Sequence, residues 1–146
     1  MNNRLKNSIE ILQRAYLEET LIAGDCQACA VGNLVAKSGY KGKPYDWRFI
    51  FVTSKGEQHF FSLGEVSPKD MFRGYKAIKA TGYSVRELAR IEYTFETALI
   101  SEEAEELPVH EVQWIRLQAV LKVLFDIEGI SYDQEVEKPF LEKALA

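Results

Sequence analysis

Hydrophobic residues recur at the three- to four-residue spacing of an α-helix over most of the chain, which predicts a helical fold. The first amphipathic helix is predicted over Arg4–Leu21, with Gly24 ending it. A second helix is predicted over Cys26–Lys37, because Asp25 stands where an N-cap residue belongs. The apolar positions of the first helix are Leu5, Ile9, Leu12, Tyr16, Leu17 and Leu21.

The pattern changes after the second helix. Gly39, Gly42 and Pro44 mark a loop, and two runs rich in aromatic and β-branched residues follow it, Trp47–Thr53 and Gln58–Ser62. The connection between these two runs contains a glycine. The segment from about 47 to 62 is therefore predicted to be a β-hairpin.

Helical spacing returns in the second half of the chain. One helix is predicted over Pro68–Ala80, with Gly82 breaking it. Ser84 and Glu87 form the capping-box signature that begins the next helix. The apolar stripe of that helix consists of Val85, Leu88, Ile91, Phe95 and Leu99.

The most apolar helix is predicted over Val109–Glu128, after an acidic loop at 102–106. Its apolar stripe is too wide for one face, so the helix is buried on more than one face or lies in a subunit interface. A short last helix can begin at Pro139. The predicted fold class is mainly α, with five or six helices and one β-hairpin in a single compact domain spanning 1–146.

Composition agrees with a folded, single-domain chain. Of 146 residues, 47% are hydrophobic and 27% are charged, which is ordinary for a globular protein. No apolar run approaches the ~20 residues that a membrane helix needs, and the polar N-terminal residues do not resemble a signal peptide. We therefore expect a cytoplasmic protein that does not associate with membranes.

The two cysteines are the sharpest local feature, in the sequence DCQACAVGN beginning at Asp25. If Asp25 is the N-cap, Cys26 is the first helical residue and Cys29 lies one turn further on the same face. The helix dipole would then lower the pKa of the Cys26 thiol, as in Cys-x-x-Cys oxidoreductases. The alternative is that small residues around Cys29 let another helix approach closely, with the thiols packed as small hydrophobes. We expect Cys29 to be buried.

A metal site would have to use Cys26, Cys29, His59 and His110, the whole cysteine and histidine inventory. The cysteine spacing suits zinc, but the two histidines are 51 residues apart, whereas structural zinc sites usually supply ligands in close pairs. A carboxylate-rich cation site is the other arrangement, from Glu87, Glu92, Glu96, His110 and Glu111. Because helical glutamates are usually exposed, the carboxylate site is not favoured. No cofactor is expected, and the sequence leaves open whether a metal binds.

Residues 78–91 resemble a helix-turn-helix, with a short helix, a glycine turn and a capped helix. The segment 37–90 carries 11 basic and 5 acidic residues, a net charge of +6. Ile78 stands where a small residue is usual, and acidic residues follow on the second helix, which disfavours phosphate contact. Nucleic-acid binding is therefore an alternative function. Its candidate contacts are Lys76, Lys79, Arg86 and Arg90.

Two of these motifs carry a resemblance to known proteins. The stretch DCQACAVG at 25–32 and the later TGYSVRELARIEYTFE at 81–96 resemble small proteins of bacteria and their phages. Those proteins have a Cys-x-x-Cys-x-x-Gly helix near the N-terminus and an Ile-Glu-x-x-Phe-Glu helix downstream. The resemblance covers about a third of the chain. It implies a helical arrangement and a bacterial or phage setting, and no activity.

Templates for catalysis are missing from the sequence: it has no Gly-rich phosphate loop, no nucleophile elbow and no HExxH motif. No catalytic residue is therefore proposed, and we expect a non-enzymatic domain that acts through protein contacts. A homodimer is expected because the helix over Val109–Glu128 is more apolar than one small domain easily covers. The alternatives are a helix-turn-helix DNA-binding regulator and a thiol redox or metal-binding protein that uses Cys26 and Cys29.

Overall fold

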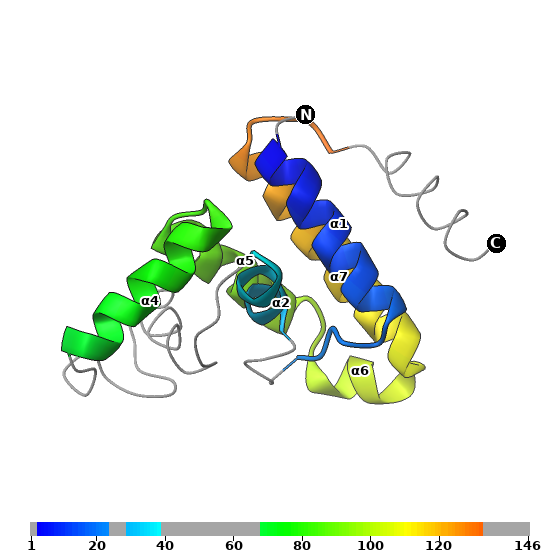
Figure 1. The fold of residues 1–146 in the computed structure, drawn as a ribbon. Helices are drawn as coiled ribbons and strands as arrows, with labels where there is room; N and C mark the ends of the chain where they lie inside the picture. The colour runs from blue at the N-terminus through cyan, green and yellow to red at the C-terminus, as the bar shows by residue number, and fades with distance from the viewer. Residues whose placement is uncertain (1–2, 24–28, 39–67, 133–146) are drawn as a thin grey trace.

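The structure is a computed structural model that describes residues 3–23, 29–38 and 68–132. Every regular element in these ranges is an α-helix (Figure 1). The helices are α1 (Asn3–Leu17), α2 (Ala30–Lys37), α4 (Pro68–Thr81), α5 (Val85–Thr97), α6 (Ser101–Glu106) and α7 (Val109–Ile127).

The predicted fold class is corrected in its β part. No strand occurs in the part of the chain that the structure describes, so the observed class is all-α rather than mainly α with a β-hairpin. The segment 47–62, where the hairpin was expected, lies outside the described residues, and so does the helix expected from Pro139.

The core lies where α1, α2, α5 and α7 meet. Helices α1 and α7 run side by side, α5 packs against α7, and α2 contacts α1, α5 and α4 (Figure 1). Residues 30–35 of α2 are all buried, which the small side chains of Ala30 and Gly32 favour because they let neighbouring helices approach closely.

The apolar width of α7 is covered largely within the chain. Its inner face contributes Leu117, Val120, Leu121, Val123, Leu124 and Phe125 to the core, and it packs against both α1 and α5. The helix is thus buried on more than one face, one of the two arrangements that its sequence predicted. Val109 in its first turn is the exception, with 71% of its surface exposed.

Several predicted boundaries agree with the structure and others differ. The capping box of α5 is confirmed, since Ser84 Oγ accepts the Glu87 N–H and the Glu87 carboxylate accepts the Ser84 N–H. Helix α1 ends at Leu17, earlier than predicted, because Glu19 adopts a left-handed conformation with φ of 61°. The expected acidic loop at 102–106 is instead the short helix α6.

Arg4 ties the beginning of α1 to the turn between α4 and α5 and to the end of α7. Its Nη1 donates to the Gly82 carbonyl oxygen at 2.7 Å, and its Nε donates to Glu128 Oε1 at 2.6 Å. The guanidinium also lies 4.4 Å from the centre of the Tyr83 ring. Gly82 has φ of +80°, a conformation that glycine adopts without strain.

Candidate functional site

Cys29 is the N-cap of α2, with extended backbone angles (φ −72°, ψ 175°). The expectation that it lies one turn inside the helix is therefore wrong. Its Sγ accepts the N–H of Gly32 at 3.2 Å, the role that a serine or aspartate oxygen usually plays at this position. The expected burial of Cys29 is confirmed, because only 1% of its surface is exposed. Cys26 lies outside the described residues.

Glu92 of α5 lies against the beginning of α2 and is almost fully buried, with 2% of its surface exposed. Its Oε2 accepts the N–H of Val31 at 3.2 Å. The pKa of this carboxyl is raised to about 8: burial is the largest cause and Glu96 also raises it, while the Cys29 thiol and the Val31 N–H lower it. The raised pKa favours the protonated form of Glu92 at neutral pH, inside a packed interface between two helices.

The candidate metal ligands that lie among the described residues do not form a cluster. Neither Cys29 nor His110 belongs to a group of three or more potential ligands among the described residues. His110 is exposed in the first turn of α7, and His59 lies outside the described residues together with Cys26. The proposed carboxylate site is also not assembled, because Glu87 caps α5 whereas Glu92 is buried against α2.

The predicted nucleic-acid contacts are exposed, but they have different surroundings. Arg90 Nη2 pairs with Asp126 Oδ2 of α7 at 2.7 Å, so its charge is already engaged by a carboxylate. Lys79 borders a groove between α1, α2 and α4. Arg86 follows the N-cap of α5, and Lys76 lies one turn before Lys79 on α4.

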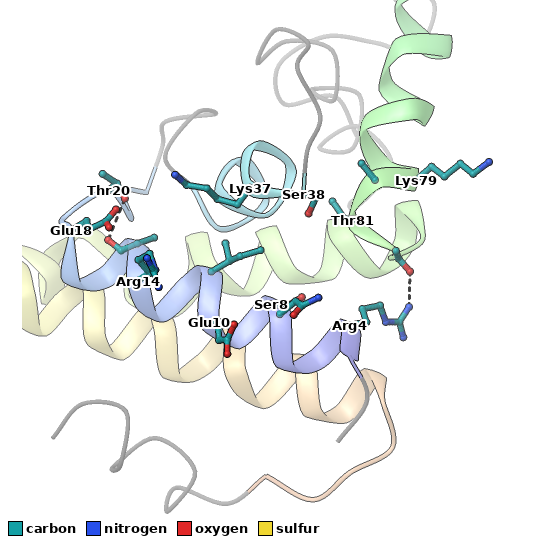
Figure 2. Close-up of a pocket in the computed structure, with 15 residues that line it drawn as sticks. Arg4, Ser8, Glu10, Arg14, Glu18, Thr20, Lys37, Ser38, Lys79 and Thr81 are labelled. Carbon is teal, nitrogen blue, oxygen red and sulfur yellow. Dashed lines mark hydrogen bonds between the residues drawn. The ribbon is translucent and has the colours of Figure 1, made fainter. Parts of the chain in front are cut away.

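This polar groove has a volume of about 710 Å³ and lies between α1 and the C-terminal ends of α2 and α4 (Figure 2). Its lining carries charges of both signs, with Glu10, Arg14 and Glu18 on the side of α1 and Lys37 on α2, while the Lys79 side chain extends away from it (Figure 2). The hydroxyls around it donate to neighbouring groups: Thr20 to Ala15 O, Ser38 to Leu34 O, and Thr81 to Ile78 O. Because the lining carries charges of both signs and its hydroxyls already donate hydrogen bonds within the protein, the groove is better suited to water than to a single anionic ligand.

A second groove is apolar and lies where residues 21–23, after the end of α1, meet α6 and the beginning of α7. Its volume is about 190 Å³. The residues that line it are Leu21, Ile22, Ala23, Ala104, Val109, Val112, Gln113 and Arg116. Val109 is 71% exposed and Ile22 is 44% exposed, so two large aliphatic side chains face solvent at its edge. Small-molecule sites usually occupy about 300–1,000 Å³, so this groove suits one or two inserted side chains.

Arg116, the cation among the described residues that line this apolar groove, is held by the fold. Arg116 is buried, and its Nη1 donates to the carbonyl oxygens of Phe95 at 2.6 Å and Glu96 at 2.8 Å, at the C-terminal end of α5. A guanidinium at this end of a helix satisfies otherwise unpaired carbonyls and complements the helix dipole. The fold therefore uses this charge to hold α5 on α7.

Sequence reasoning did not identify the apolar groove, because Ala23 and Ala104 are brought together only by the packing of the helices. A weak signal was present: Val109 lies three residues before Val112, so it continues the apolar stripe of its helix into the first turn. A large apolar residue at the exposed end of such a stripe is a candidate for an external contact.

Comparison of the chain with protein-family models, with curated proteins and with solved structures finds no match. Within residues 3–23, 29–38 and 68–132, no helix is long and apolar enough to cross a membrane. The resemblance to small bacterial and phage proteins therefore stays a prediction. The functional proposal below is based on the geometry of the apolar groove.

Proposed function

We propose that this chain is a non-enzymatic helical domain that acts by binding another protein through the apolar groove between residues 21–23, α6 and α7. The observation that carries the proposal is the exposure of Val109 and Ile22 beside a concave apolar surface. Burying exposed aliphatic surface contributes roughly 25 cal/mol per Å² of apolar area. Apolar anchors that enter a desolvated pocket also carry most of the binding energy in protein interfaces.

Selection from a displayed library of random peptides tests this function for a partner of unknown sequence. The selected peptides should share large aliphatic or aromatic side chains and should lose binding to a Val109→Asp variant. This substitution places an acidic residue in the first turn of α7, where the helix dipole favours it, so the fold should be retained.

The matched control is Ile130→Asp, which places the same charge on an exposed aliphatic residue just beyond the other end of α7. This control should bind the selected peptides like the unmodified protein. Peptides that bind both variants equally, or a selection that yields no peptide sensitive to Val109→Asp, would contradict the proposed function.

Homodimer formation remains a prediction with a narrower basis than the sequence suggested. The inner face of α7 is covered by α1 and α5 of the same chain, so a second copy would compete with any other partner for the end that carries Val109, and the homodimer is the alternative occupant of this surface. Light scattering at micromolar concentration measures the oligomeric state directly, and a strict monomer would contradict the homodimer.

A further inference from the structure

The border of the apolar groove is strongly acidic. Helix α6 has the sequence SEEAEE, and its four glutamates, Glu102, Glu103, Glu105 and Glu106, are all exposed. Within the part of the chain that the structure describes, none of these glutamates forms an ion pair. Ala104, at the centre of the same helix, lines the groove. The helix that supplies this apolar contact point of the groove therefore carries four exposed carboxylates.

The sequence of α6 leaves these charges unfavourably placed. A six-residue helix is about 9 Å long, so all four carboxylates lie within roughly one Debye length of one another. Glu103 and Glu106 are three residues apart on one face, a spacing at which like charges destabilise a helix. Glu105 and Glu106 also lie at the negative end of the helix dipole, where cations are favoured. Cations supplied by a bound partner would relieve both effects.

Among the described residues that line the groove, none offers a free cation to oppose this field. Arg116 is the basic residue among those that line it, and two carbonyl oxygens of α5 already accept hydrogen bonds from its guanidinium. The adjoining first turn of α7 adds the exposed carboxylate of Glu111. When a partner places aliphatic side chains in this groove, the residues that flank them therefore lie in a negative electrostatic potential.

We propose that the partner segment is basic: a lysine- or arginine-flanked stretch inserts one or two aliphatic side chains between Ile22 and Val109 while its cations lie against α6. This inference rests on the proposed function and adds to it the chemistry of the partner. The apolar contact supplies binding energy, and charge complementarity selects the partner and speeds association. Interfaces in which an apolar face enters a groove commonly combine these two contributions.

Two synthetic peptides with identical leucine anchors test the proposal, one flanked by lysines and the other by glutamates. Fluorescence anisotropy with the full chain should show that the lysine peptide binds more tightly at low salt, and that the difference shrinks as salt is added. The double variant Glu103→Gln/Glu105→Gln should weaken binding of the lysine peptide roughly three- to tenfold, since it removes the two charges beside Ala104 and glutamine keeps a similar helix propensity. The control Glu10→Gln/Asp126→Asn removes the same net charge from exposed sites on α1 and α7, and should leave the affinity within about twofold.

The possible outcomes separate the two proposals. If both peptides bind equally and both need Val109, the groove binds protein but its partner is not basic, so this inference is wrong and the proposed function stands. If neither peptide binds, both are wrong. If the free protein is a dimer that Val109→Asp converts to a monomer, a second copy occupies the groove, and the basic partner is likewise contradicted.

Discussion

Replacing Glu92 by glutamine should stabilise the protein at neutral and alkaline pH. Burial against α2, together with the neighbouring Glu96, raises the pKa of this carboxyl to about 8. The ordinary value for glutamate is 4.5. Between these two values the folded protein keeps a proton that the unfolded chain has released. The free energy of unfolding therefore falls as pH rises through this window, by about 1.4 kcal/mol per pH unit for a single group.

The expected size of the effect follows from that slope. This contribution of Glu92 is fully present below the unfolded pKa and is lost as pH rises towards the folded pKa, a loss on the order of a few kcal/mol. Glutamine has nearly the same shape, keeps an oxygen that can accept the Val31 N–H, and never ionises. The advantage of the variant should therefore be small near pH 5 and grow to a few kcal/mol near about pH 8.

Denaturant unfolding of the unmodified protein and of Glu92→Gln at about pH 5, 6.5 and 8 measures this difference. The control is Glu10→Gln, which makes the same chemical change at an exposed carboxylate on α1. A Glu92→Gln effect that does not change between about pH 5 and 8 would refute a proton held by Glu92 in the folded state.

Three further predictions concern stability and reactivity. Arg116→Gln should lower the free energy of unfolding by about 2–3 kcal/mol, because it removes a charged donor from the carbonyl oxygens of Phe95 and Glu96. Arg90→Gln, which breaks an exposed ion pair, should lower it by less than about 1 kcal/mol in the same denaturation assay. Gly82→Ala should cost about 1–3 kcal/mol in thermal unfolding, since φ is +80° and the new Cβ would lie 3.2 Å from a neighbouring arginine side chain; an unchanged midpoint would contradict this. In a Cys26→Ser background, the Cys29 thiol should react with a thiol reagent only as fast as the protein opens, and rapid labelling of the native protein would overturn its packing role.

Local sequence signals predicted most of the helices well. The start of α5 was predictable because Ser84 and Glu87 satisfy the first backbone N–H groups of the helix through their own side chains. The start of α2 was not, because Asp25 offered a conventional N-cap while the observed cap is a cysteine sulfur. Sulfur is a weak acceptor, so statistics of N-cap residues do not point to Cys29.

Tertiary packing decided the features that the sequence left open. The wide apolar stripe of α7 was equally compatible with burial inside one chain and with a subunit interface, and only the positions of α1 and α5 distinguish the two. Glu92 follows Ile91 on a helix whose buried stripe also contains Leu88 and Phe95, yet a glutamate is normally interpreted as exposed. The apolar groove arises from segments about 80 residues apart, so no local pattern encodes it.

Methyl NMR during titration with the lysine-flanked peptide reports where a partner binds, which is the point on which the proposed function depends. We expect the methyl signals of Ile22, Val109 and Val112 to shift with a common affinity, while those of Ile130 stay unchanged. Shifts that are confined to Ile11, in the polar groove, or to Ile130 would place the binding surface elsewhere and contradict binding at the apolar groove.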